Sequence, residues 1–254
     1  MSADDTALKS MPALVVDAVS KRFHLKHTHS LKETFIAWTK RKQLRSDFTA
    51  LEDITFTVPE GQSVAVMGYN GSGKSTLLKL MSGVLRPDSG TLLTRGRVAG
   101  LIEVGAGFHP DLTGRENVYL NAAILGMKEH EIDQVFDDIV QFAEIEEFLD
   151  QEVKHYSSGM FMRLAFSVAI HVRLDILLVD EILSVGDAPF REKCRMKFEE
   201  MLEAEKTMVV VSHDMEMVRE LCSRGIVIKK GKLRFDGAID EAIAYLQSEA
   251  YLKD

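Results

Sequence analysis

The feature that most constrains this fold is a glycine-rich segment, Gly68-Tyr-Asn-Gly-Ser-Gly-Lys-Ser75, which matches the pattern G-x-x-x-x-G-K-[ST] at every fixed position. An apolar run, Val64 to Met67, precedes it. Apolar residues then follow at helical spacing: Leu77, Leu78, Leu80 and Met81. A strand, such a loop and a helix in this order predict a binding site for the phosphates of a nucleoside triphosphate.

Each residue type in this loop has a physical reason. Glycines let the backbone curl so that successive N–H groups point at phosphate oxygens, and the helix that begins near Gly73 adds the positive end of its dipole. Lys74 is expected to reach the β- and γ-phosphates, and the Ser75 hydroxyl to ligate Mg²⁺. The expected nucleotide-binding residues are Gly68, Tyr69, Asn70, Gly71, Ser72, Gly73, Lys74, Ser75 and Thr76.

Two further apolar runs, Ile176 to Val179 and Met208 to Val211, lack alternation. With Val64 to Met67, they predict strands covered on both faces, as a parallel sheet in an α/β protein requires. Two earlier segments, 13–23 and 51–58, are also expected to be strands, and the second alternates apolar and polar residues as a half-buried strand does.

Polar side chains follow these buried strands. Asp180 and Glu181 come directly after the run that ends at Val179. Asp180 is expected to hold Mg²⁺ through water, and Glu181 to orient and deprotonate the attacking water. His213 follows the next run; such a histidine is most often a surface or capping residue, but at this sheet edge it would bond the γ-phosphate or the water. Lys74, Glu181 and His213 are the expected catalytic residues.

The sequence between the first two buried runs is helical. Thr113-Gly-Arg-Glu116 predicts a capping box that opens a helix ending near Gly126. We therefore expect a helical subdomain of roughly residues 108–168, inserted in the α/β core. Later, Asp187 followed by Pro189 predicts the N-cap of another helix. Its apolar stripe is Phe190, Cys194, Phe198 and Met201.

Charge and composition exclude several classes of function. The net charge of −8 argues against a nucleic-acid partner. No apolar run reaches the length of about 18 to 20 residues that a transmembrane helix needs. Cys194 and Cys222 match no metal or redox spacing, which favours reduced thiols and a cytoplasmic protein.

A basic segment stands out against this acidic background, since residues 21–45 hold eight Lys or Arg and one acid. Trp38 and the adjacent Lys40, Arg41 and Lys42 allow two interpretations. They belong either to a surface helix or to a helix at the boundary between membrane and cytosol, with its basic side chains near lipid phosphates.

Tyr156-Ser-Ser-Gly-Met160 resembles the signature loop, Leu-Ser-Gly-Gly-Gln, of the ATP-binding cassette (ABC) transporter ATPases. Ser157 and Gly159 occupy matching positions. The resemblance runs from about Leu14 to Leu246. It implies an α/β fold: a P-loop NTPase ABC nucleotide-binding domain with a RecA-like core, a small antiparallel β-subdomain and an inserted helical subdomain, all within a single domain, 1–254.

The resemblance also implies roles for other residues. Ser184-Val-Gly-Asp187 matches the D-loop, and His213 matches the switch histidine. Phe23 lies where the family stacks an aromatic ring on adenine. His24, beside it, is the alternative residue for this contact. Ser157, Gly159 and Asp187 are thus expected nucleotide contacts. Two copies would sandwich two ATP molecules head to tail, which predicts a homodimer.

Two departures from the family pattern point to one branch. Glu103 stands where the family has the Q-loop glutamine and would ligate Mg²⁺ with Ser75 and Asp180, although it adds negative charge beside the triphosphate. Ser158 and Met160 replace the usual Gly and Gln of the signature. With segments 103–110, 112–117 and 185–190, these residues resemble the polysaccharide-export branch, which serves O-antigen, teichoic acid, capsule or galactan export.

The implied function is therefore that of the ATP-hydrolysing subunit of an exporter that moves a lipid-linked glycan. ATP and Mg²⁺ are the expected cofactors, and a separate polytopic permease at the cytoplasmic face of the membrane is the expected partner. No C-terminal carbohydrate-binding domain is expected. The alternatives are transport of a lipid or small molecule, a soluble ABC ATPase without a transport role, and a non-catalytic nucleotide sensor.

Overall fold

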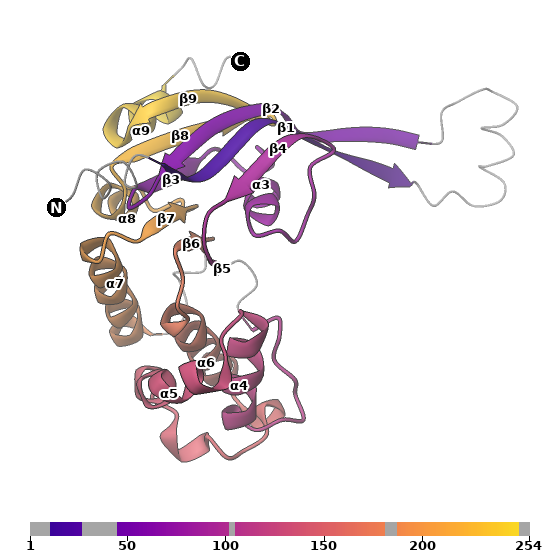
Figure 1. Ribbon diagram of the computed structural model, residues 1–254. Coiled ribbons are helices and arrows are strands. Elements are labelled where there is room, and N and C mark those ends of the chain that lie inside the picture. The colour runs from indigo at the N-terminus through magenta and orange to yellow at the C-terminus, as the bar shows by residue number, and fades with distance from the viewer. Residues whose placement is uncertain (1–10, 27–44, 102–104, 181–186, 249–254) are drawn as a thin grey trace, which may run out of the picture.

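The computed structural model describes residues 11–26, 45–101, 105–180 and 187–248. Two β-sheets lie close together in the upper part of Figure 1, and a group of helices lies below them. The chain enters through the smaller sheet and ends beside the larger one.

The larger sheet has six strands in the order β5-β6-β7-β3-β8-β9. Their bounds are β5 Val98–Gly100, β6 Ile176–Val179, β7 Thr207–Val210, β3 Ser63–Met67, β8 Arg224–Lys229 and β9 Lys232–Ala238. The first five are parallel and β9 is antiparallel. Every residue of β3, β6 and β7 is buried, as the unalternating apolar runs predict. β6 has the predicted bounds, β3 begins one residue before its predicted run, and β7 begins and ends one residue earlier than predicted.

The smaller sheet is antiparallel, in the order β2-β1-β4, with β1 Pro12–Lys26, β2 Arg45–Pro59 and β4 Ser89–Thr94. β1 and β2 extend beyond the predicted segments because they pair from Pro12↔Pro59 to Lys26↔Arg45. Their far ends project from the rest of the molecule in Figure 1. The alternation predicted in β2 is present, with Ile54, Phe56 and Val58 buried between exposed neighbours.

Apolar clusters cover both faces of the larger sheet. One face packs against α3 (Lys74–Met81) and the smaller sheet. The other packs against α7 (Ala188–Glu203), α8 (Met215–Leu221) and α9 (Ile239–Gln247). The predicted stripe of α7 is buried here in full: Phe190, Cys194, Phe198 and Met201.

Three helices lie between β5 and β6 in the chain: α4 (Gly114–Ile124), α5 (Glu129–Ala143) and α6 (Ser158–His171), with short 3₁₀ turns at Glu146–Phe148 and Val153–His155. They pack around an apolar cluster of their own. The predicted capping box is present, because Thr113 Oγ1 accepts from the Glu116 amide at 3.2 Å and Glu116 accepts from the Thr113 amide at 2.8 Å.

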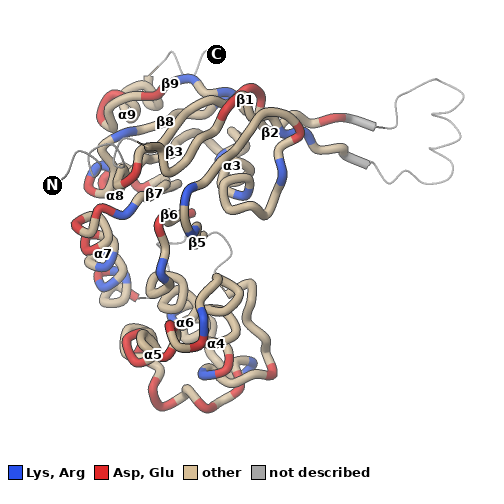
Figure 2. The backbone as a smooth tube through the Cα atoms, in the orientation of Figure 1, with Lys and Arg blue, Asp and Glu red and all other residues tan. Residues whose placement is uncertain are grey.

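Charged residues are distributed unevenly over these helices. Figure 2 shows acidic residues along α5 and both signs along α7. Most of the basic segment 21–45, including Trp38 and Lys40 to Lys42, lies outside the described residues. Among the described residues, no helix combines the length and apolar character needed to cross a bilayer.

Candidate functional site

The parallel strands bring three predicted site segments to one edge of the larger sheet. The glycine-rich loop follows β3, Asp180 follows β6, and His213 comes shortly after β7, which lies between those two strands. Parallel strands all end at the same edge, where open α/β sheets bind their ligands. Loop, carboxylate and imidazole therefore share one side of the molecule.

The loop requires glycine at two positions for reasons of space and backbone conformation. At Gly68, with φ +150°, a Cβ would lie 2.2 Å from the Ile228 carbonyl oxygen. At Gly73, with φ +115°, a Cβ would lie 2.7 Å from both the Ala50 carbonyl oxygen and Leu51 Cδ2. Any side chain at these positions would push the loop away from the strands beneath it.

The polar groups of the loop suit an anion. Gly73 is the N-cap of α3 and offers no capping side chain, and the first bond of the helix runs from the Leu77 amide to the Gly73 carbonyl. A helix N-terminus leaves its first amides without intrahelical acceptors, at the positive end of the dipole. The buried Lys74 ammonium donates to the Gly68 carbonyl at 2.7 Å. Ser72 Oγ is buried and makes no hydrogen bond within the described chain.

A pocket of about 230 Å³ opens on this loop, lined by Phe48, Ala50 and residues 70–76. Phe23 does not line it. Phe23 pairs directly with Phe48 across β1 and β2, so the two rings belong to the same face of the hairpin. Phe48 is 50% exposed and is the aromatic residue that reaches the loop. Sequence reasoning missed Phe48, because the register of β1 on β2 is not readable from either strand alone.

Of the remaining site residues predicted at this edge, the structure describes some and not others. Asp180 is half-buried and His213 is exposed between β7 and α8. Asp214, directly after His213, caps α8 by accepting from the amides of Glu216 and Met217. Glu103 and Glu181 lie outside the described residues.

The signature-like residues lie elsewhere, in the helical group. Ser157 is the N-cap of α6, and its Oγ accepts from the Met160 amide at 3.1 Å. With this cap, α6 begins at Ser158. Ser157 and Gly159 are exposed, and neither lines the pocket at the glycine-rich loop. The structure therefore does not bring them to the loop of their own chain.

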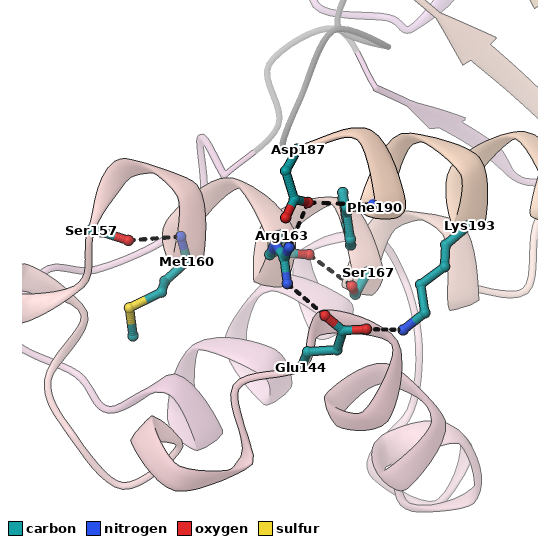
Figure 3. A network of polar contacts seen from close by, with 8 residues as sticks. All are labelled: Glu144, Ser157, Met160, Arg163, Ser167, Asp187, Phe190 and Lys193. Carbon is teal, nitrogen blue, oxygen red and sulfur yellow. Dashed lines mark hydrogen bonds and ion pairs between the residues drawn. The ribbon is translucent and has the colours of Figure 1, made fainter.

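Asp187 lies in a network of ion pairs. It caps α7, accepting from the Phe190 amide at 3.3 Å, and its Oδ1 accepts from Arg163 of α6 at 2.7 Å. Figure 3 shows Arg163 between Asp187 and Glu144, with Lys193 on the far side of Glu144. The pKa of Asp187 is lowered, mainly by the hydrogen bond from Arg163, so this carboxylate stays ionised to a lower pH than an ordinary aspartate. Sequence analysis did not single out Arg163, Glu144 or Lys193.

Comparison with known proteins places this geometry in a family. The model of the family described as ABC transporter matches residues 51–184, which include the glycine-rich loop, the helices α4 to α6 and Asp180. The chain belongs to the ABC transporter family. It is thus an ATP-binding and ATP-hydrolysing domain that uses Mg²⁺, as the sequence predicts.

Several relatives of this ABC domain are similar over most of its length. An O-antigen export system ATP-binding protein, RfbB of Klebsiella pneumoniae, is 46% identical over 77% of this chain and 80% of its own. RfbB of Myxococcus xanthus is 43% identical over 93% of this chain and 56% of its own. The teichoic acids export ATP-binding protein TagH of Listeria monocytogenes is 40% identical over 88% of this chain and 66% of its own.

Solved structures agree on the fold. The ABC domain matches an ATP-binding subunit of an ABC transporter with a TM-score of 0.73 at 21% identity, over 95% of this chain and 98% of the other. It also matches a dimeric ATP-binding cassette in a post-hydrolysis state, bound to ADP and Pi, with a TM-score of 0.69 at 22% identity, over 89% and 98% of the two chains. The predicted P-loop ABC fold is confirmed.

Proposed function

We propose that this chain is the ATP-hydrolysing subunit of an ABC exporter that moves a lipid-linked polysaccharide across the cytoplasmic membrane. The observation that carries the proposal is the identity of 40 to 46% with the O-antigen and teichoic acids export proteins over 77 to 93% of the chain. The chain spans between about half and four fifths of the length of these relatives, so the cargo and the partners belong to the proposal.

The pocket at the glycine-rich loop is the proposed ATP site. The first amides of α3 and the Lys74 ammonium face phosphate oxygens there, and the unsatisfied Ser72 hydroxyl adds a donor. Ser75 and Asp180 supply oxygen ligands of the kind that Mg²⁺ prefers, with Glu103 as a further candidate outside the described residues. When bound, Mg²⁺ neutralises charge on the β- and γ-phosphates. We assign the contact with the nucleotide base to Phe48, which pairs with Phe23 and lines the pocket.

We assign catalysis to residues around this pocket. Glu181 orients and deprotonates the attacking water, and His213 donates to the γ-phosphate from the loop after β7. The glycine-rich loop, Asp180 and His213 share the carboxyl edge of one parallel sheet, which supports a common site. Lys74 stabilises the charge that develops on the transferred phosphoryl group.

The signature-like turn supports a homodimer. Ser157 and Gly159 form an exposed helix N-terminus, an anion site by its backbone amides, yet they do not line the ATP pocket of their own chain. In a head-to-tail dimer, the N-terminus of α6 in one copy would face the γ-phosphate held by the other. Each copy would then supply half of each site.

An apolar groove supports a docking site for the permease. It has a volume of about 360 Å³ and is lined by the turn after α3, by β5, by residues 105–107 and by α4 and α6. Val84 and Ile124 both line it and are 62% and 61% exposed, and exposed apolar patches often mark protein–protein contacts. We propose that a cytoplasmic helix of the permease covers this groove and holds the chain at the membrane as a peripheral subunit.

Gene deletion tests the cargo most directly. Cells that lack this chain are expected to accumulate one lipid-linked surface glycan inside and to lose it from the surface, and the wild-type gene restores export. The Lys74→Ala variant, made at normal abundance, should not restore it, because ATP turnover is lost. Normal surface glycans in the deletion strain, with a lipid or small molecule accumulating instead, would contradict the proposal.

A further inference from the structure

The polar network in Figure 3 joins three helices, α5, α6 and α7. Arg163 of α6 donates to Glu144 Oε2, at the C-cap of α5, and to Asp187 Oδ1, at the N-cap of α7, both at 2.7 Å. Lys193, in the second turn of α7, donates to the other oxygen of Glu144. Two cations and two anions thus form a linear chain of ion pairs, Lys193–Glu144–Arg163–Asp187, across α5, α6 and α7.

Packing restricts the position of Arg163 further. Its side chain is only 18% exposed, and its guanidinium lies 5.0 Å from the centre of the Phe190 ring, which is 1% exposed in the core. A guanidinium is planar and donates in fixed directions, so it can hold two carboxylates at a set angle in a way that a lysine cannot. The contacts of Arg163 therefore fix the start of α7 relative to α6.

The network lies next to the two turns that are expected to contact nucleotide, at the start of α6 and at the start of α7. Arg163 is four residues after Gly159, hence on the same face of α6, one turn from its N-terminus. The long side chains of a helix point back toward its N-terminus. The bond to Asp187 therefore joins the signature-like end of α6 to the N-cap of α7. In the proposed dimer, the α6 end of this bond would face the partner copy, and Asp187 at the other end is a further expected nucleotide contact.

We propose that Arg163 is a positioning residue that couples the signature turn of α6 to Asp187, so that both approach the partner's nucleotide as one rigid unit. This inference depends on the proposed function of these two turns at the dimer interface. Arg163 itself does not line the ATP pocket. Its effect on hydrolysis passes through Asp187, the group that it holds.

Steady-state ATPase kinetics of the full chain test the coupling. Arg163→Gln keeps a polar side chain but removes the charge, and kcat should fall about 10- to 100-fold, as expected when a reacting constellation is misplaced by about 1 Å. The KM for ATP should change less than about threefold, because binding to the loop of the same chain is untouched. A fall in kcat of less than about twofold would overturn the proposal.

A double-mutant cycle separates positioning from general damage. Asp187→Asn keeps an oxygen that can cap α7 and loses the ion pair. If Arg163 acts through Asp187, the double variant should have the kcat of the worse single variant, whereas multiplied losses would show that the two residues act separately.

Arg224→Gln is the matched control for stability. Arg224 is 22% exposed and donates to both oxygens of Asp236 at 2.6 Å, at the opposite edge of the sheet from the loop. The Arg224→Gln variant should lower the melting temperature about as much as Arg163→Gln does, and its kcat should stay within about twofold of the wild-type value. An equal loss of kcat in both variants would overturn the proposal.

Amide exchange provides a readout that does not depend on ATPase activity. The Phe190 amide, which Asp187 caps at 3.3 Å, should exchange faster in Arg163→Gln than in the wild type or in Arg224→Gln. Unchanged exchange would refute the coupling itself. A wild-type chain that neither dimerises nor hydrolyses ATP would instead refute the proposed function, with the exchange result still deciding the role of Arg163.

Discussion

Gly73 shows how much a single residue decides in this molecule. Its φ of +115° is a conformation that residues with a side chain rarely adopt, and the space for a Cβ is filled by Ala50 and Leu51 of β2. Lys74, which follows it directly, folds back on the loop and donates to the Gly68 carbonyl at 2.7 Å. The phosphate-binding role of the glycine-rich loop could therefore be predicted from the sequence, because its backbone geometry allows few residue types at these positions.

Gly73→Ala is expected to destabilise the chain by about 3 kcal/mol or more and to abolish ATP binding, since backbone strain adds to a clash with the Ala50 carbonyl and the Leu51 side chain. Gly126→Ala is the control, because Gly126 also has a positive φ of +91° but a Cβ there meets nothing within 4 Å. It should cost about 1 to 2 kcal/mol and leave ATP binding unchanged. Denaturant unfolding and nucleotide titration measure both effects, and equal losses in the two variants would contradict this account of the loop.

The pKa values of two carboxylates give the Arg163 network a pH dependence. The pKa of Glu144 is lowered from 4.5 by hydrogen bonds from Lys193 and then Arg163, and that of Asp187 is lowered from 3.8, chiefly by Arg163. Groups with depressed pKa values stabilise the fold fully above their unfolded pKa and lose that contribution as pH falls through the folded pKa. The melting-temperature difference between wild type and Arg163→Gln should stay constant from pH 7 to about pH 5 and shrink below about pH 4. A difference that grows on acidification would contradict this.

Elements with strong local signals were predictable. β6 was predicted to the residue because four consecutive apolar residues end at a carboxylate, and the capping box at Thr113 was predicted from two side chains alone. Contacts between elements were not predictable. The pairing of Phe23 with Phe48 depends on a register shifted by several bulges, and Arg163 meets a partner 24 residues away that no local pattern indicates.

Two matched helix caps separate stability from function. Ser157 caps α6 with a bond of 3.1 Å, and Thr113 caps α4 with one of 3.2 Å. Ser157→Ala and Thr113→Ala should each cost about 1 kcal/mol of folding free energy. Only Ser157→Ala should also lower ATPase activity, because its hydroxyl is proposed to face the partner's nucleotide. Similar activity in both variants would remove Ser157 from the site.

The groove beside α4 yields a test of permease docking. Ile124→Asp places a charge on the proposed docking surface and should release the chain from membranes that contain its permease, with little effect on the melting temperature. Met196→Asp is the control, because Met196 is 53% exposed on α7 and does not line the groove. Membrane association is measured by sedimentation of vesicles, and retention of both variants would contradict this docking site.

At the scale of the whole molecule, the two proposed nucleotide contacts lie on different parts of the fold. The ATP pocket lies at the carboxyl edge of the larger sheet, whereas the exposed N-terminus of α6 belongs to the helices placed below the sheets in Figure 1. Parallel topology explains the first placement, and the cap at Ser157 explains the second. The exposed N-terminus of α6, which we propose as a second anion site, does not line the pocket at that loop, so under the proposed function the complete site requires a second copy.

The molar mass of the Glu181→Gln variant in solution, measured by sedimentation equilibrium with and without Mg²⁺-ATP, tests that requirement most directly. Slow hydrolysis in this variant should trap the ATP-bound state. We predict a monomer without nucleotide and a dimer with Mg²⁺-ATP. A variant that binds Mg²⁺-ATP and stays monomeric, while the wild-type chain hydrolyses ATP as a monomer, would contradict the central claim that two copies share each site.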